Sequence, residues 1–100
     1  MVNNTTIARQ NPQLKKLRIR IDSVDQAILT ALAKRMNLVR AVGKHKRTLS
    51  VPPLDAKRWD EILRTRVRAG KSMRLSPSFV KALLTLIHRE GLTLQQKKKA

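Results

Sequence analysis

The sequence of 100 residues predicts an all-α protein with one long helix, two shorter helices and a second copy of the chain as partner. Three observations support this fold class. Apolar residues between Leu14 and Lys46 alternate between three- and four-residue spacing, which is typical of one continuous amphipathic helix. Prolines preceded by cap-forming residues mark the starts of helices. No segment shows the alternating pattern of a strand.

The long helix is expected to begin at Asn11 and Pro12 and to end near Thr48 or Leu49. Asparagine is a favourable N-cap, and proline at the first helical position loses no hydrogen bond. Residues 50–53, Ser-Val-Pro-Pro, cannot continue the helix because proline lacks an N–H and disfavours the α conformation before it. Residues 1–11 show no periodicity and are expected to form a flexible leader. The apolar stripe of the long helix contains Leu14, Leu17, Ile21, Val24, Ile28, Ala31, Leu38 and Val42.

Two cations lie in the register of this stripe. Arg35 falls on the stripe, where burial of an unpaired charge would cost several kcal/mol. Lys46 follows at a spacing that returns it to within about 20° of Arg35 and roughly 16 Å along the axis. Both side chains therefore point to the same side of the helix. Gly43 is expected either to weaken the helix or to permit the close approach of another backbone or a ligand.

The second helix is expected from Leu54 or Asp55 to about Gly70, and the third from Ser76 and Pro77 toward Gln96. Each begins with a residue suited to a helix N-terminus. A helical domain would then cover residues 12–96, with a basic tail at residues 97–100. The apolar face of the second helix contains Trp59, Ile62, Leu63 and Val67. The third helix is expected to direct inward Phe79, Val80, Leu83, Leu84, Leu86 and Ile87.

The length of the first helix predicts an antiparallel homodimer. A helix of about 35 residues is roughly 50 Å long, and two shorter helices cannot cover it. A second copy paired about residue 31 would bring Arg18 of one chain opposite about residue 44 of the other. That position lies between Arg35 and Lys46. Within one straight helix Arg18 and Arg35 are about 25 Å apart, so the three cations can converge only in a dimer.

The composition is strongly basic, with 23 Lys and Arg against 6 Asp and Glu and a formal charge of +17. This charge predicts attraction to polyanions or to small anions. Nucleic acid is therefore a candidate partner, although no zinc-finger or RNA-recognition motif is present. Only Trp59 and Phe79 could stack on bases.

Other features exclude several classes of chemistry. Cysteine is absent, which rules out disulfides, thiolate catalysis and cysteine-based metal sites. His45 and His88 do not have a metal-ligand spacing, and both are interpreted as non-catalytic. The N-terminus is polar and the apolar runs are too short for a bilayer span, so a cytoplasmic protein is expected.

A series of spaced motifs runs through the chain from about Leu14 to Gln96. They are Leu17-Arg18-x-x-Ile21-Asp22-x-x-Asp25-x-x-Ile28-Leu29, Ala33-Lys34-Arg35-Met36, Val42-Gly43-x-x-Lys46, Pro53-Leu54-Asp55-x-x-Arg58-Trp59, Leu75-Ser76-Pro77-x-Phe79-Val80 and Ile87-His88-x-Glu90 with Gln95. These motifs resemble those of the all-helical chorismate mutases. The resemblance implies an intertwined homodimer with two equivalent active sites, which isomerises chorismate to prephenate in aromatic amino-acid biosynthesis without a cofactor or a metal.

The resemblance also implies a role for each matching residue. Arg35 and the partner's Arg18 would clamp the two substrate carboxylates, for which the planar guanidinium is well suited. Lys46 and Gln95 would donate hydrogen bonds to the ether oxygen, where negative charge grows as the C–O bond breaks. Asp55 would accept a hydrogen bond from the ring hydroxyl. Such a rearrangement needs a compact substrate conformer and preorganised donors, and it needs no nucleophile.

Three further positions are candidates for the substrate pocket. Arg58 would line the pocket beside the hydroxyl. Trp59 stands where many relatives carry a glutamate that contacts this hydroxyl, although other relatives have an Arg-Trp pair here. Gly91 stands where a serine commonly contacts a carboxylate. Loss of that serine would remove on the order of 1 kcal/mol of substrate binding and leave a water-sized gap.

Each candidate residue also has a purely structural interpretation. Arg35 could pair with Asp25 or Asp55, and Asp55 could act only as a helix cap. Lys46, near the end of a basic run, could be a solvated surface residue or a partner of the helix dipole at the C-terminus. Gln95 could be a frayed terminal residue. Trp59 is more often a core residue than a ligand contact.

The sequence is also compatible with other functions. An isochorismate-pyruvate lyase of salicylate synthesis would use the same scaffold, lysine and arginines. A basic helical dimer that binds nucleic acid would need no active site, and its binding would depend strongly on salt. A mutase-like protein kept only as an interaction module is a further, weaker alternative.

Overall fold

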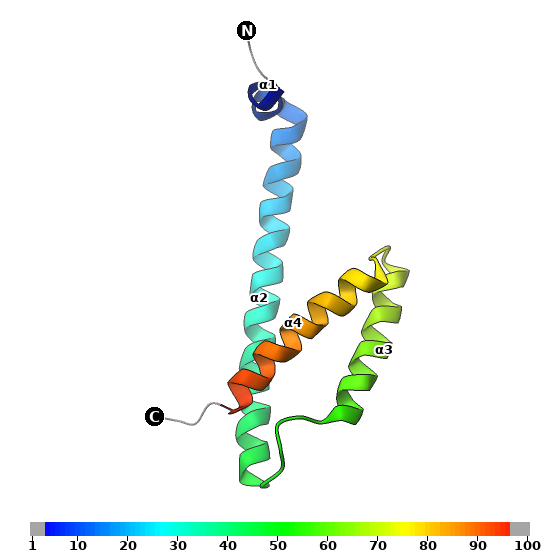
Figure 1. Cartoon of the computed structure of the whole chain (residues 1–100). Helices are drawn as coiled ribbons and strands as arrows, with labels where there is room; N and C mark the ends of the chain where they lie inside the picture. The colour runs from blue at the N-terminus through cyan, green and yellow to red at the C-terminus, as the bar shows by residue number, and fades with distance from the viewer. Residues whose placement is uncertain (1–3, 97–100) are drawn as a thin grey trace. The chain divides into compact units, whose positions relative to one another are not determined.

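The computed structural model describes residues 4–96, and every element among them is helical (Figure 1). The helices are α1 (Asn4–Gln10), α2 (Pro12–Thr48), α3 (Ala56–Ser72) and α4 (Pro77–Gln96). Residues 4–96 contain no strand, which confirms the all-α class. None of these helices is both long and apolar enough to cross a bilayer. The predicted basic tail at 97–100 lies outside the described residues.

The structure divides within α2 into two units, one that ends at Arg35 and one that begins at Met36. In the first unit, Asn11 Oδ1 accepts a hydrogen bond from Leu14 N at 3.1 Å, so Asn11 is the N-cap of α2 as predicted. The α1 helix lies within the segment expected to be a leader. The flexibility of that segment stays a prediction.

The apolar stripe of α2 is exposed throughout residues 11–30, including the side chains of Leu17, Ile21, Val24 and Ile28. In α2 the only buried residue is Gly43, in the second unit. A stripe of this kind gains no stability from burial within one chain, because its apolar surface remains in water.

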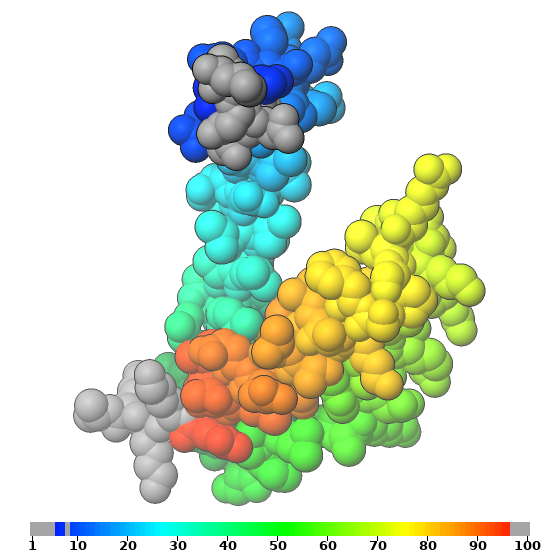
Figure 2. Space-filling view, turned by 45° about the horizontal axis from the view of Figure 1, so that its top comes forward, coloured from blue at the N-terminus to red at the C-terminus, as the bar shows by residue number. Residues whose placement is uncertain are grey.

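The second unit has its apolar centre where α3 packs against α4. Figure 2 shows the orange atoms of α4 directly beside the green atoms of α3. Ile62 and Val80 are the buried hydrophobic residues of the described chain, with 8% and 7% of their surface exposed. Gly70 permits the close packing, because a Cβ there would lie 2.8 Å from Val80 Cγ2. The α3 helix therefore continues past Gly70 to Ser72, two residues beyond the expected end.

The apolar face of α4 is narrower than expected. Val80 is buried, and Leu84 and Ile87 are half-buried. The other three residues that were expected to face inward are exposed, so the prediction was wrong for them: Phe79, Leu83 and Leu86. One neighbouring helix covers only part of the circumference of α4, so residues further around it stay in water.

The starts of α3 and α4 follow the predicted cap residues. Asp55 Oδ1 accepts from Arg58 N at 3.0 Å, and Ser76 Oγ accepts from Phe79 N at 3.3 Å. Each side chain satisfies one of the N–H groups that have no partner at a helix start. This confirms the predicted N-termini of both helices, with a small shift of α3 to Ala56.

The ends of α2 and α3 use a geometry that the sequence did not predict. Ser50 and Arg74 have φ angles of 59° and 64°, in the left-handed region that favours glycine. At the end of α2, Val51 N donates to Lys46 O at 2.9 Å, and the equivalent bond at the end of α3 is also 2.9 Å. These bonds form a Schellman motif at each helix end.

Candidate functional site

Lys46 lies in the last turn of α2 and is half-buried. Its ammonium donates a hydrogen bond to the carbonyl oxygen of Pro53, in the connection between α2 and α3. Lys46 is therefore not fully solvated, and its role in a site stays a prediction. The contact directs the ammonium toward the segment that leads into Asp55.

Gly43 lies one turn before Lys46, and the end of α4 packs directly on it. A Cβ at position 43 would lie 2.9 Å from both Cα and Cγ of Gln95. Real Cβ atoms do not approach a backbone carbon so closely, so only glycine fits here. This confirms the expected close approach of another backbone at Gly43. It also places Gln95 beside the turn of α2 that carries Lys46.

Gln95 is held at this position by its backbone as well as by its side chain. Arg47 Nη1 donates to the carbonyl oxygen of Gln95 at 2.7 Å. Gln95 is half-buried within α4, so the interpretation as a frayed terminal residue is wrong. Its Oε1 atom is buried and has no hydrogen-bond partner within residues 4–96.

A buried polar atom without a partner costs about 1–3 kcal/mol, so the Gln95 Oε1 atom adds no hydrogen-bond stabilisation within residues 4–96. A rotation of about 180° around the last torsion exchanges the amide oxygen and nitrogen. The same position can therefore accept a hydrogen bond from a ligand or donate one to it.

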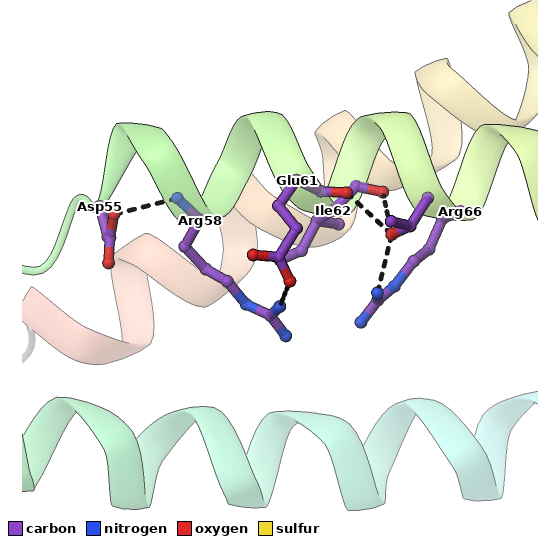
Figure 3. Close-up of polar contacts among 6 residues, drawn as sticks. Asp55, Arg58, Glu61, Ile62 and Arg66 are labelled. Carbon is purple, nitrogen blue, oxygen red and sulfur yellow. Dashed lines mark hydrogen bonds and ion pairs between the residues drawn. The ribbon is translucent and has the colours of Figure 1, made fainter.

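Asp55 and Arg58 are linked in a row of contacts along one side of α3 (Figure 3). Asp55 caps the helix by accepting from the backbone N of Arg58. The Arg58 guanidinium forms an ion pair with Glu61, one turn further along α3, and both side chains are about half exposed. Exposed pairs of this kind contribute at most about 1 kcal/mol, so Arg58 can exchange this partner for an anionic ligand.

Trp59 and His88 form a stacked pair between α3 and α4. Their ring centroids lie 3.9 Å apart and the ring planes differ by 11°. Both residues are half-buried. Stacking of this kind adds about 0.5–1.5 kcal/mol beyond the burial of area. This agrees with the interpretation of Trp59 as a core residue, and no local sequence pattern indicated His88 as its partner.

Gly91 is buried and faces α2 one turn before the Gln95 contact. A Cβ at position 91 would lie 3.4 Å and 3.9 Å from the two Cγ atoms of Val39, which is ordinary van der Waals distance. Gly91 and Gln95 on α4 thus pack on Val39 and Gly43 on α2, each pair separated by one helical turn. The space at Gly91 accommodates a small side chain.

Arg18 and Arg35 belong to the first unit. Arg18 is exposed, whereas Arg35 is half-buried. Both lie in the uninterrupted helix α2, where a rise of about 1.5 Å per residue separates them by about 25 Å. One chain therefore does not bring Arg18 to Arg35.

The contacts of the second unit bring Gly43, Lys46 and Gln95 together, and they add Arg47 and Pro53, which the sequence did not indicate as site residues.

Comparison with known proteins places these residues in a family. The model of a family described as chorismate mutase type II matches residues 17–96. The T-protein of Enterobacter agglomerans is 34% identical over 86 residues, which cover 86% of this chain and 23% of that protein. The bifunctional chorismate mutase/prephenate dehydratase of Escherichia coli K12 is 32% identical over 87 residues, which cover 87% of this chain and 22% of that enzyme.

A third relative is closer in size. The 4-amino-4-deoxychorismate mutase of Streptomyces pristinaespiralis is 28% identical over 82 residues, which cover 82% of this chain and 64% of that protein. The chain spans less than a quarter of the length of the first two relatives. Since the family match includes α3, α4 and most of α2, the chain belongs to the chorismate mutase type II family.

Proposed function

We propose that this chain is a chorismate mutase, an isomerase that converts chorismate to prephenate in aromatic amino-acid biosynthesis. The contact between Gln95 and Gly43 carries the proposal, because it brings a side-chain amide whose oxygen has no partner within residues 4–96 beside the turn that carries Lys46. The family match supports the same activity.

The reaction breaks one C–O bond and forms one C–C bond within a single molecule, so no atom or electron enters from outside. Negative charge grows on the ether oxygen as the C–O bond breaks. Lys46 and the Gln95 amide donate hydrogen bonds to that oxygen in this proposal. An ammonium has three N–H donors, so Lys46 can retain its bond to Pro53 O while it donates to the substrate. Donors fixed before the reaction stabilise developing charge without reorganisation.

The remaining groups bind and orient the substrate. Arg35 takes one carboxylate, and Asp55 accepts from the ring hydroxyl through the oxygen that does not cap α3. The Arg58 guanidinium leaves Glu61 and points into the substrate pocket. Trp59 and Gly91 form walls of this pocket. The basic composition, with a formal charge of +17, attracts the dianionic substrate.

The proposal includes a homodimer in which Arg18 of the partner subunit completes each site. The exposed apolar stripe of α2 supports this assembly, because a second α2 in antiparallel orientation would cover it. Within residues 4–96, only two hydrophobic residues are buried, Ile62 and Val80. A partner would supply the missing apolar contacts.

The activity is tested by incubation of the protein with chorismate while chorismate loss and prephenate formation are followed. We expect prephenate from the parent and a fall in kcat of about 150-fold for Lys46→Ala, since a donor to developing charge contributes about 3 kcal/mol. Parallel reactions with 4-amino-4-deoxychorismate and with isochorismate define the substrate. Salicylate and pyruvate from isochorismate, without prephenate from chorismate, would identify a lyase instead.

The shared site is tested with mixed dimers. Arg18→Ala and Lys46→Ala subunits are each expected to be nearly inactive alone. After they are unfolded together and refolded, about half of the dimers contain one subunit of each kind, and one of the two sites in such a dimer is intact. Activity should then return to about a quarter of the parental value. No recovery would show that Arg18 does not act across a subunit interface.

A further inference from the structure

Arg47 is a residue of α2 that binds the far end of α4. Its Nη1 atom donates at 2.7 Å to the carbonyl of Gln95, a residue 48 positions away in the sequence. The last carbonyls of a helix have no partner within the helix, so Arg47 acts as a C-terminal cap from another element. The neighbouring Lys46 points instead to Pro53 O.

The positive charge of Arg47 lies at the C-terminal ends of two helices, α2 and α4. The last turn of α2 contains His45, Lys46 and Arg47, whereas the last turn of α4 contains no basic residue. Helix C-termini carry partial negative charge, which a cation stabilises. Arg47 therefore supplies α4 with the positive charge that its own last turn lacks.

Gly43 and Arg47 contact the same residue of α4 from one side of α2. The Cα of Gln95 lies over Gly43, and the carbonyl of Gln95 accepts from Arg47, one turn further along. Two contacts spaced by one helical turn fix both the distance and the register of α4 on α2. Together the two contacts restrain the backbone of Gln95 while α4 is docked, and its side-chain torsions stay free to adjust.

We infer that Arg47 is a positioning residue, which holds the Gln95 amide where it can donate to the reacting oxygen. The inference rests on the proposed mutase function. Arg47 acts through the backbone of Gln95 and does not itself contact the substrate. Its loss should therefore weaken stabilisation of the transition state more than binding of the substrate.

The test compares Arg47→Gln and the conservative Arg47→Lys with a matched control, Lys44→Gln. Lys44 is an exposed cation of the same helix, so the control removes the same charge. We expect Arg47→Gln to lower kcat at least about 10-fold with a change in KM below about 3-fold, because small misplacements of a catalytic group are costly. Arg47→Lys should recover part of the loss, and Lys44→Gln should match the parent.

Hydrogen–deuterium exchange gives a readout that does not depend on activity. Amides of residues 92–96 should exchange faster in Arg47→Gln than in the parent or in Lys44→Gln, because the last turn of α4 loses its anchor. Equal kinetics of Arg47→Gln and Lys44→Gln would overturn the inference, and so would unchanged exchange. A parent without turnover would overturn the proposed function, and the exchange comparison would still decide whether Arg47 anchors Gln95.

Discussion

Replacement of Gly43 with alanine provides a sharp test of the packing between α2 and α4. A Cβ at this position would meet the Cα and Cγ of Gln95 at 2.9 Å. Carbon atoms in good contact are about 3.5–4.0 Å apart, so the end of α4 would have to withdraw by at least about 0.6 Å. Rotation of the Gln95 side chain cannot relieve the clash, because one of the two atoms belongs to the backbone.

Two opposing terms set the expected change in stability. Overpacking of a close contact costs about 1–3 kcal/mol. Alanine within a helix gains about 1 kcal/mol over glycine, which offsets part of that cost. We therefore expect Gly43→Ala to lower the free energy of unfolding by about 1 kcal/mol. The same displacement moves Gln95 away from Lys46, so kcat should fall by about 10-fold or more.

Gly91→Ala is the matched control, since the same atom is added to a buried glycine on the other side of the same helix contact. Its Cβ would meet Val39 no closer than 3.4 Å, so the helix-propensity gain is not offset by a clash. Urea denaturation of both variants at one protein concentration should show Gly91→Ala more stable than Gly43→Ala by about 2 kcal/mol. Equal stabilities, or full activity of Gly43→Ala, would refute the close approach.

Three further predictions concern the helix end, the dimer and the charge. Arg74→Gly should raise the free energy of unfolding by about 0.5–1 kcal/mol, because φ at Arg74 is 64° and glycine adopts this conformation without strain. Arg68→Gly within α3 should lower the free energy of unfolding by a similar amount, so thermal melting that shows the two variants alike would contradict this. Ile21→Asp should convert the proposed dimer to a monomer in sedimentation experiments, whereas Ile19→Asp should not. Ile19 and Ile21 are 67% and 56% exposed in the single chain, but only Ile21 lies on the stripe, so equal effects would argue against pairing through it. The value of kcat/KM for chorismate should fall as salt is raised, and a value independent of salt would remove electrostatic steering from the mechanism.

The starts of the helices could be predicted from the sequence because a cap acts over three residues. Asn11, Asp55 and Ser76 each bond to a backbone N–H three positions ahead, so residue type alone located the helix starts. The helix ends were harder to predict. Ser50 and Arg74 occupy left-handed positions where glycine is the usual signal, while Gly70 serves packing inside α3.

The long-range contacts of the site could be predicted only in part. The sequence indicated that Gly43 would admit a close neighbour, but it could not identify that neighbour as Gln95. Nothing in the local pattern connects Arg47 with a residue 48 positions away. The roles of Arg18 and Arg35 stay predictions from the family resemblance, since they require a second chain.

The contact between Arg47 and Gln95 has a consequence for the order in which the second unit folds. Packing of α3 on α4 closes only the short connection at residues 73–76, so this hairpin can form early. Docking of the end of α4 onto α2 joins residues 48 positions apart, and the entropy cost of loop closure grows with that separation. We expect docking to come late in folding and to be an early step in local opening. Gln95 and Lys46 can then separate and meet again while the α3–α4 hairpin stays folded.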